Sequence, residues 1–393
     1  MRVLIIDCNL RYMNPMRNLL PYYLAQSGDD VVFYGPGYSS GQVLEDGLEK
    51  FLQSQESFDI EVRTVQAIPQ DEIKSISKSF AKDKIEFYRK CNNFSFPVKD
   101  LVSFWSDKSM ETVCARSRVL LLHQFDFQVM SEQLKDYLLD GFDMFVGLSG
   151  DFWDNHDYSK LNISNAYRHT RCWSDIINFA PSKVLGLPNF VASHEFDFNQ
   201  HYYRNFDWSV VGTTYNNRKI VKQLFTHNSI KFSSGRTIRY TKLKLLEKAK
   251  LYPFKKRRNL DSLNHEFHYT LINSKYSYTC GSDLRMPVRK FFEIPAAGCT
   301  LVCTPCIGFK KLGFKDKENS FTCAPEEILD MNHYLSDSPE LAQTVSDAGR
   351  NLVLRKHTAD VRASQLRQGL KLLSQDKYRG SYWSNGDLIF ADI

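Results

Sequence analysis

Short apolar runs alternate with helical patterns along almost the whole chain. Residues 2–7 (RVLIID), 119–125 (VLLLHQF) and 143–150 (DMFVGLSG) are typical of buried strands, and segments with helical character follow them. Strands that alternate with helices usually pair in parallel, because each helix returns the chain to the edge of the sheet from which it started. The sequence therefore predicts an α/β protein with largely parallel sheets.

The alternation forms two series. The second begins at residues 207–214 (DWSVVGTT) and includes further strands at 276–280 and 299–304 and helices near 325–335, 339–356 and 358–373. A chain of 393 residues is long enough for two domains of about 150–200 residues each. We expect two Rossmann-like domains, 1–200 and 205–375, that face a central cleft, with a tail at 376–393 that crosses back to the first domain. Such sheets bind ligands beyond the carboxyl ends of their strands.

Composition is typical of a globular protein, with 42% hydrophobic and 24% charged residues. No apolar run approaches the roughly 18–20 residues that span a bilayer, and the first residues lack the features of a secretory signal. Nine cysteines, an odd number scattered over a long chain, favour a reducing compartment over a disulfide framework. We expect the protein to be cytoplasmic.

Positive charge is concentrated in one segment, although the net charge is only +6. Residues 231–258 contain eleven Lys and Arg and a single acidic residue, Glu247. This segment is compatible with peripheral contact with an anionic membrane or another polyanion; the alternative is a solvated helix face and loop. No zinc-finger, helix-turn-helix or RNP pattern accompanies it, so we expect no nucleic acid partner.

Three cysteines raise the question of a metal cluster, because Cys299, Cys303 and Cys306 have the C-x3-C-x2-C spacing of radical iron–sulfur enzymes. Cluster ligands need a flexible loop, whereas CTLVCT is a strand pattern. Fewer than 90 residues follow Cys306, too few for the barrel that such a motif opens. We interpret these cysteines as small buried residues and keep a Cys-ligated metalloprotein as an alternative.

The C-terminal half resembles a known family. The segments CGSDLRMPVRKFFEIPAAGCTLVCT (280–304), PEEILDMNHYL (325–335) and SPELAQTVSDAGRNLVLRKHT (338–358) resemble the C-terminal signature of group-1 glycosyltransferases, closest to their CgeB-like branch. DWSVVGTTYNNRKIVKQL (207–224) resembles the opening of that branch's donor-binding domain. The resemblance covers residues 205–370 and implies the GT-B fold. It further implies that a nucleotide-sugar donor binds the C-terminal domain and that an acceptor binds the N-terminal domain.

By this resemblance, the first wall of the diphosphate site is the turn at Gly212, Thr213 and Thr214 with Arg218 and Lys219 on the next helix. A departing diphosphate develops negative charge, so its site needs preorganised positive groups, and helix N-termini also favour anions. The alternative is an ordinary turn between a strand and a helix.

The second wall is the helix that starts near Pro287, with Arg285 and Arg289 near its beginning. Glu293 resembles the family's glutamate that binds the ribose hydroxyls, and a carboxylate suits a diol because it accepts two hydrogen bonds. Alternatively, Arg289 and Glu293 form a plain i,i+4 salt bridge. Many retaining relatives carry E-x7-E, but Arg285 occupies the first acidic position. The donor therefore need not be a simple hexose, and retention versus inversion stays open.

In the N-terminal half, His123 ends a predicted strand, and in related enzymes a comparable histidine lies near the reacting sugar. The loop after the next strand carries Asp151, Asp154 and His156, which would orient the acceptor hydroxyl or remove its proton. A buried structural histidine and a helix-capping Asp151 are the alternatives.

These residues together predict a glycosyltransferase that transfers a sugar from a nucleotide-sugar donor to a hydroxyl of a glycan, glycoconjugate or other acceptor. We expect neither a metal nor another cofactor. The alternative with the same fold is a protein that binds nucleotide sugars without turnover.

Overall fold

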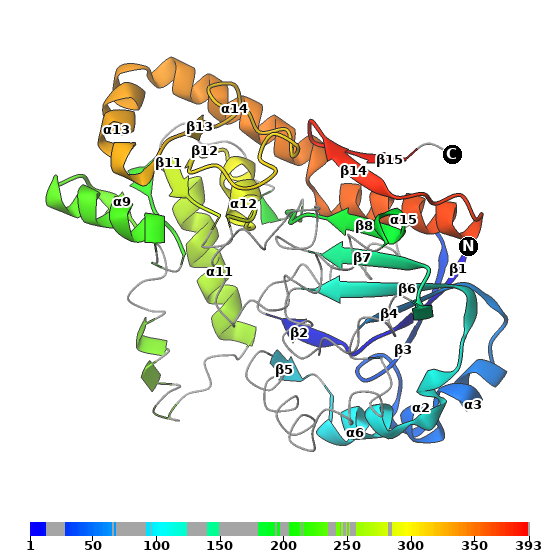
Figure 1. Cartoon of the computed structure of the whole chain (residues 1–393). Coiled ribbons are helices and arrows are strands. Elements are labelled where there is room, and N and C mark those ends of the chain that lie inside the picture. The colour runs from blue at the N-terminus through cyan, green and yellow to red at the C-terminus, as the bar shows by residue number, and fades with distance from the viewer. Residues whose placement is uncertain are drawn as a thin grey trace. The chain divides into compact units, whose positions relative to one another are not determined.

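The computed structural model describes residues 1–12, 28–64, 67, 92–94, 96–123, 140–148, 180–192, 195–196, 204–212, 214, 216–234, 241–243, 245–246, 249, 251, 257–281 and 285–391. The chain divides into two compact units (Figure 1). Unit 1 comprises Met1–Pro188, Arg362–Tyr382 and Leu388–Ile393, and unit 2 comprises Asn189–Val361 and Trp383–Asp387. The contacts group residues 362–375 with unit 1, although the sequence analysis placed them in the second domain.

Unit 1 is built on a six-stranded sheet with the order β3-β1-β4-β6-β7-β8. Every pair of neighbouring strands in it is parallel. The strands are β1 (Arg2–Ile6), β3 (Asp30–Tyr34), β4 (Phe58–Thr64), β6 (Ala115–His123), β7 (Met144–Leu148) and β8 (Val184–Leu187). The strands predicted at 2–7, 119–125 and 143–150 are confirmed in the described parts of these ranges.

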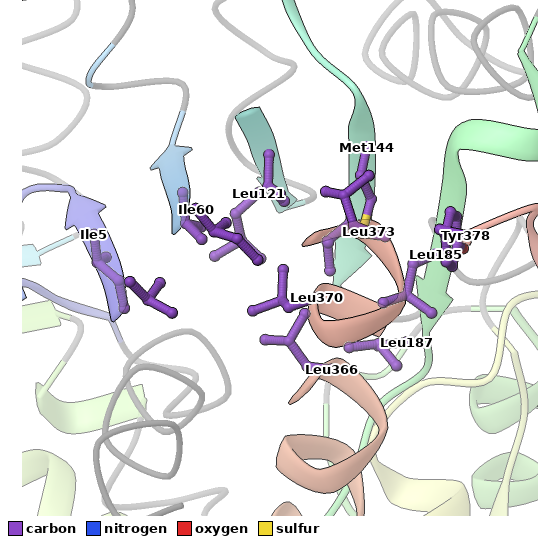
Figure 2. Packing of buried hydrophobic residues seen from close by; sticks show 14 of the residues in the cluster. Ile5, Ile60, Leu121, Met144, Leu185, Leu187, Leu366, Leu370, Leu373 and Tyr378 are labelled. Carbon is purple, nitrogen blue, oxygen red and sulfur yellow. The ribbon is translucent and has the colours of Figure 1, made fainter. Parts of the chain in front are cut away.

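Both faces of this sheet are buried, as expected for a parallel sheet. One face, with residues of β1, β4, β6, β7 and β8, packs against the apolar stripe Leu366, Leu370 and Leu373 of helix α15 (Ala359–Ser374) (Figure 2). The other face forms a second core with α2 (Gly41–Asp46), α3 (Leu48–Gln53), α6 (Val98–Ser106) and the 3-10 turn η2 (Lys108–Glu111). Alternation along β1 sends Ile5 to the first core and Leu4 and Ile6 to the second.

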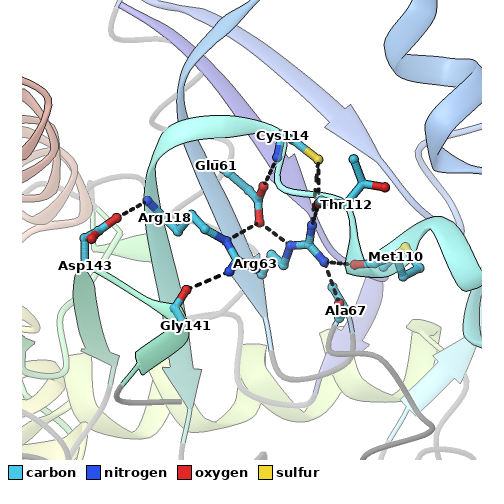
Figure 3. Close-up of polar contacts among 9 residues, drawn as sticks. All are labelled: Glu61, Arg63, Ala67, Met110, Thr112, Cys114, Arg118, Gly141 and Asp143. Atoms are coloured by element: carbon cyan, nitrogen blue, oxygen red, sulfur yellow. Dashed lines mark hydrogen bonds and ion pairs between the residues drawn. The ribbon is translucent and has the colours of Figure 1, made fainter. Parts of the chain in front are cut away.

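A buried polar cluster joins β4 to β6 in unit 1 (Figure 3). The Glu61 carboxylate accepts hydrogen bonds from the Arg63 guanidinium, from the Cys114 amide at 2.7 Å and from Arg118 Nε at 3.4 Å. Arg63 also donates to backbone carbonyls, including that of Thr112 at 2.7 Å. Both Glu61 and Arg63 are almost completely buried, so each charge depends on the other for its compensation.

Unit 2 contains a five-stranded sheet with the order β10-β9-β11-β12-β13, again parallel at every pairing. Its strands are β9 (Phe206–Ser209), β10 (Phe232–Ser233), β11 (Ser274–Thr279), β12 (Thr300–Cys303) and β13 (Phe321–Thr322). The helices are α9 (Asn216–His227), α11 (Arg257–Ile272), α12 (Lys290–Ala296), α13 (Ile328–Asp337) and α14 (Pro339–Lys356), with a 3-10 turn η8 at Pro325–Glu327. Two Rossmann-like parallel sheets in an α/β chain were predicted from the sequence and are confirmed.

One core of unit 2 is centred on Trp208. Its ring packs 5.1 Å from both Phe225 of α9 and Tyr276 of β11, measured between ring centroids. The indole nitrogen donates a 2.7 Å hydrogen bond to Asn332 of α13. This core therefore fixes α9 and α13 against the sheet, and with them the segment that follows β9.

The remaining elements are short: η6 (Pro181–Lys183), a two-stranded antiparallel pair of β2 (Leu10–Tyr12) and β5 (Asn92–Phe94), and a two-stranded sheet of β14 (Ser381–Ser384) and β15 (Asp387–Phe390). Among the helices in the described ranges, none has the length and hydropathy needed to cross a bilayer.

Candidate functional site

The predicted donor-binding residues of unit 2 come from segments that follow β9 and β11. Gly212 lies shortly after β9, Arg285 lies in the loop after β11, and Glu293 lies on α12, which leads into β12. Because β9, β11 and β12 run in parallel, their carboxyl ends meet at one edge of the sheet. This edge is where we place the candidate site.

Two cationic side chains converge beside Gly212. A β-carbon built on this glycine would lie 2.8 Å from Nη1 of Arg218 and 3.1 Å from Nζ of Lys290. Gly212 has a φ of +95°, which favours glycine. Arg218 is buried and donates from Nη1 to the Val211 carbonyl at 3.3 Å. Like charges so close together favour the binding of an anion between or beside them.

Sequence reasoning identified Arg218 but missed Lys290. The sequence signal that could have indicated Lys290 is the basic pair Arg289-Lys290 at the start of α12. Only Arg289 of this pair was predicted to bind the donor. Which of two adjacent side chains reaches the neighbouring strand is decided by the orientation of the helix. A motif alone does not show that orientation.

Lys222, one turn after Arg218 on α9, extends the positive region. Its ammonium donates to Oγ1 of Thr214 at 2.8 Å. Burial, and secondarily the charge of Arg218, lowers the pKa of Lys222. Thr214 therefore contacts the cationic region, whereas Lys219 is exposed. Thr213 lies outside the described residues.

Arg289 lies between two carboxylates. Its Nη1 lies 2.9 Å from Oε1 of Glu293, and Nη2 pairs with Oε2 of Glu195. Its Nε donates to the Phe190 carbonyl at 3.2 Å. Opposite charges on both sides raise the pKa of Arg289 even though burial acts against its charge. The structure thus contains the i,i+4 pair of Arg289 and Glu293, which is the alternative given above, together with a second acid, Glu195, that was not predicted.

Glu293 is buried, with 5% of the residue exposed. Its neighbours Phe291, Phe292 and Ile294 are fully buried, so α12 has no freely solvated face at this point. The Glu293–Arg289 contact uses Oε1. Within the described ranges, no contact is recorded for Oε2, which is available to accept hydrogen bonds from a ligand.

Arg285 lies between β11 and α12, close to Gly281. Its φ is +52°, an uncommon value for a residue other than glycine. The Met286 amide donates to the Gly281 carbonyl at 2.8 Å, and a β-carbon on Gly281 would lie only 2.5 Å from the Arg285 carbonyl carbon. The loop therefore requires a glycine at its start, and the residue it presents, Arg285, is exposed.

A chain of hydroxyl and amide groups connects α9 to the end of β12. Asn217 donates to Oγ1 of Thr304 at 3.3 Å, and the hydroxyls of Thr304 and Tyr278 are 2.7 Å apart. The first turn of α9, which carries Arg218, is thereby anchored at the carboxyl edge of the sheet. These polar residues gave no signal in the sequence.

For the predicted acceptor residues the structure gives only the position of one. His123 is the last residue of β6, at the carboxyl edge of the first sheet; its side chain is not described. Asp151, Asp154 and His156 lie outside the described residues.

The three cysteines of the C-x3-C-x2-C pattern are on or beside β12, which confirms the predicted strand. Cys303 is its last residue, and Cys299 and Cys306 flank it. All three are buried thiols, and burial raises the pKa of Cys299 to about 12. In the parts of the chain that the structure describes, no group of three or more His, Cys, Asp or Glu residues is arranged to hold a metal ion.

Described residues of unit 2 line a cavity at each of two places. One, of about 650 Å³, lies at the amino-terminal edge of the sheet and is lined by Asp207, Lys275 and Thr300, among others. It contains none of the predicted donor residues. The other, of about 780 Å³, lies beyond β12 and β13 and is lined by Cys306, Lys310 and others.

Comparison with known proteins agrees with this geometry. Residues 211–368 match the family model described as glycosyl transferase-like. The chain is similar in structure to HepE from Anabaena in complex with UDP-glucose, with a TM-score of 0.50 and 10% identity over 94% of this chain and 99% of that one. It is also similar to sucrose-phosphate synthase from Thermosynechococcus elongatus, with a TM-score of 0.48 and 11% identity over 96% and 100% of the two chains.

No functionally curated protein matches the sequence significantly. The family match begins at Val211, beside the glycine on which the cations converge, and includes Arg218, Arg289 and Glu293. Residues 211–368 thus match a glycosyl transferase-like family, and the two parallel Rossmann-like sheets, together with the likeness to HepE, show the GT-B fold.

Proposed function

We propose that this protein transfers a sugar from a nucleoside-diphosphate sugar to a hydroxyl of a glycan, glycoconjugate or other acceptor. The observation that carries the proposal is the convergence of Arg218 and Lys290 on Gly212, on the same edge of the sheet as the buried carboxylate of Glu293. HepE, whose fold this chain shares, was crystallised with UDP-glucose. A nucleoside diphosphate sugar is accordingly the first class of donor to test.

The cationic pair suits the leaving group of such a reaction. As the sugar–phosphate bond breaks, negative charge grows on the diphosphate, and groups already oriented toward it stabilise the transition state more than the ground state. Arg218 is held by the Val211 carbonyl, and Lys222 adds charge on the same helix. Fixed cations take the part that a divalent metal takes in other transferases, and we propose that the reaction is metal-independent.

Glu293 suits the ribose of the donor. Arg289 occupies one carboxylate oxygen and leaves the other to accept hydrogen bonds from a vicinal diol. Because the side chain is buried, such bonds would form with little competition from water. Arg285 takes the place where many relatives carry the acid that contacts the sugar. We propose that it contacts a donor phosphate or an acidic donor sugar.

Acceptor binding belongs to unit 1 in this proposal. His123 lies at the carboxyl edge of its sheet, and Asp151, Asp154 and His156 follow β7 in the sequence. One of these groups would accept the proton of the attacking hydroxyl. In this proposal the limits expected from the sequence, 1–200 for acceptor binding and 205–375 for donor binding, are replaced by the units that the contacts define, with Met1–Pro188 in the acceptor unit and Asn189–Val361 in the donor unit.

The basic segment 231–258 supports a proposal about location. Leu251 is 75% exposed and Leu245 is 62% exposed, the two highest values among the exposed large hydrophobic residues in the described ranges. Both lie in the segment with the highest positive charge. Exposed leucines among lysines and arginines fit an anionic lipid surface, so we propose a cytoplasmic enzyme with peripheral membrane contact. Cosedimentation with vesicles containing an anionic lipid should fall in Leu251→Ser and persist in Leu341→Ser, an exposed leucine elsewhere.

The central experiment combines binding with turnover. A thermal-shift screen against nucleoside diphosphates and their sugars should show an increase in the melting temperature with at least one of them, because such ligands bind only the folded state. Donor hydrolysis or transfer should then be lost in Lys290→Ala and Glu293→Gln. Lys310→Ala, in the loop after β12, serves as the control for removal of a lysine. Stabilisation without turnover would favour a nucleotide-sugar-binding protein, and no stabilisation by any ligand would refute the proposal.

A further inference from the structure

Glu195 lies more than 90 positions before Arg289 in the sequence, yet the two side chains form a buried ion pair. We propose that Glu195 is a positioning residue for the donor ribose: it fixes Arg289, and Arg289 in turn orients the Glu293 carboxylate. This inference rests on the proposed function, and it adds a residue that neither the sequence nor the family match singled out.

The Arg289 guanidinium is held on three sides. Nε donates to the Phe190 carbonyl at 3.2 Å, Nη2 pairs with Glu195, and Nη1 lies 2.9 Å from Oε1 of Glu293. A planar guanidinium held at each of its nitrogens has little rotational freedom. The oxygen that Arg289 contacts is therefore held in place, and the direction of the remaining oxygen, Oε2, follows from it.

Glu195 is itself anchored to the backbone. Its Oε2 accepts the Ala192 amide at 2.9 Å, and the Glu195 amide donates to the Ala192 carbonyl at 3.0 Å. The Val191 amide donates to the His357 carbonyl at 3.1 Å, which fixes this turn against the end of α14. The positioning of Glu293 thus depends on the backbone contacts of Ala192 with Glu195 and does not rest on α12 alone.

The charged groups at this edge of the sheet suit different parts of the donor. Burial acts to raise the pKa of Glu195, but the Arg289 charge outweighs it and holds the pKa below its usual value. The two carboxylates carry one more charge than the single guanidinium between them, and the charge of His268 also acts on Glu195. That surplus favours hydroxyl donors such as a ribose diol and opposes a phosphate. The phosphates are left to Arg218 and Lys290, whose positive charges converge beside Gly212.

A purely structural salt bridge would not need Glu195. Glu293 alone neutralises Arg289 with an i,i+4 partner at 2.9 Å. The additional, partly buried acid has an electrostatic cost that Arg289 shares with Glu293 and that His268 lowers. A donor diol that contributes hydrogens to Glu293 would lower that cost further.

The test compares ligands that differ in the ribose hydroxyls or lack the nucleoside altogether. Binding constants are measured by calorimetry for wild type and Glu195→Gln with three probes: the nucleoside diphosphate that stabilises wild type best, its 2′,3′-dideoxy analogue, and inorganic pyrophosphate. We expect wild type to prefer the ribose form over the dideoxy form by about tenfold or more. Glu195→Gln should lose most of that preference and bind the dideoxy analogue and pyrophosphate as wild type does.

Matched variants separate positioning from a loss of structure. Glu195→Asp keeps the charge and should retain part of the ribose preference. Glu318→Gln removes an exposed carboxylate paired with Lys315 and should behave as wild type. If Glu195→Gln fails to fold, Glu195→Asp and Arg289→Lys carry the test, and both should lower the ribose preference with pyrophosphate binding unchanged.

The outcomes distinguish this inference from the function on which it rests. If wild type binds no nucleoside diphosphate, the proposed function fails and takes the inference with it. If wild type prefers the ribose form and Glu195→Gln keeps that preference, the inference alone is wrong. Equal weakening of all three probes by Glu195→Gln would also overturn it, because that result indicates a general structural role.

Discussion

The Arg218 guanidinium lies where a side chain on Gly212 would have to be, since a β-carbon there would come within 2.8 Å of Nη1. The glycine thus serves the site in two ways. It adopts a φ of +95° without strain, and it leaves open the space on which Arg218 and Lys290 converge.

We expect Gly212→Ala to weaken nucleoside diphosphate binding by tenfold or more, because the new methyl group displaces both cations. The unfavourable φ should also destabilise unit 2 by about 1–2 kcal/mol. Gly28→Ala is the matched control, since Gly28 has a similar φ of +81° and, among the described residues, no atom lies within 4 Å of the added carbon. Calorimetric titration of both variants checks the expectation, and equal ligand affinity in the two would contradict it.

Much of the fold was predictable because the periodicity of apolar residues indicates strands and helices directly. The apolar runs that became β1, β6, β7 and β12 are short and bounded and contain branched residues, and the predicted helices at 339–356 and 358–373 correspond closely to α14 and α15. Residues 42–55 also have a helical pattern, but Gly47, whose φ is +88°, divides it into α2 and α3. A single glycine in an otherwise helical pattern gives only a weak sign of such a break.

It was harder to predict which of the two domains α15 belongs to. Its stripe of Leu366, Leu370 and Leu373 shows that the helix packs on something apolar, and the pattern is equally compatible with either sheet. Because α15 directly follows α14 in the chain, the sequence analysis assigned it to the second domain, whereas its contacts are with the first sheet (Figure 2).

The candidate site was predictable only where one segment carries the information. Glu293 and Arg289 are four residues apart on α12, and their apolar neighbours indicated burial. Lys290 and Glu195 were missed for a different reason. Lys290 lies beside Gly212 and Glu195 pairs with Arg289, and both neighbours are far away in sequence. Long-range convergence of this kind is set by packing, and one sequence does not show it.

The buried cluster around Glu61 predicts a pH dependence of stability in unit 1 (Figure 3). Burial acts to raise the pKa of Glu61, but the charge and hydrogen bond of Arg63 outweigh it and lower the pKa. When the folded-state pKa is lowered, the unfolded state binds protons first as the pH falls. The stabilisation is therefore complete above the unfolded pKa of about 4.3 and is lost as the pH falls through the lower, folded value.

The variant Glu61→Gln isolates this contribution. It should destabilise the protein on the order of 3 kcal/mol near neutral pH, because Arg63 is left buried without its counter-charge. Below the folded pKa the difference from wild type should shrink. Urea midpoints measured from pH 7 to pH 3 check this expectation. A gap between Glu61→Gln and wild type that stays constant over the whole range would show that the carboxylate charge is unimportant.

The cysteines should be unreactive in the folded protein. Burial is the largest cause that raises the pKa of Cys114, Cys299 and Cys323 to about 12, so the reactive thiolate is scarce at pH 8. We expect thiol-labelling reagents to modify these three residues at least about 100-fold more slowly in native protein than in denaturant, with peptide mass spectrometry to identify each site.

A separate measurement tests the alternative of a metal held by Cys299, Cys303 and Cys306. Elemental analysis of protein purified without oxygen should find neither iron nor zinc in stoichiometric amounts. A metal that is present in wild type and lost in Cys303→Ala would contradict our interpretation of the three cysteines as structural residues.

Helix α14 offers a case in which alanine should destabilise a helix. Replacing a glycine inside a helix by alanine usually stabilises it by about 1 kcal/mol. At Gly349, however, a β-carbon would lie 2.6 Å from the backbone oxygen of Asn319 and 3.5 Å from the Pro295 side chain. Gly349 therefore allows α14 to pack closely against the loop before β13 and against α12.

We expect Gly349→Ala to lower the stability of unit 2 by about 1–3 kcal/mol, because a backbone oxygen cannot move aside without shifting its whole loop. Gly369→Ala in α15 is the matched comparison: its added carbon would meet the flexible side chain of Leu185 at 2.9 Å. The end of a side chain can shift more easily than a backbone oxygen, so the loss of stability should be smaller than for Gly349→Ala. The melting temperatures of the two variants test whether Gly349→Ala loses more stability than Gly369→Ala. If Gly349→Ala melts at or above the wild-type temperature, close backbone packing of α14 does not explain why a glycine stands at this position.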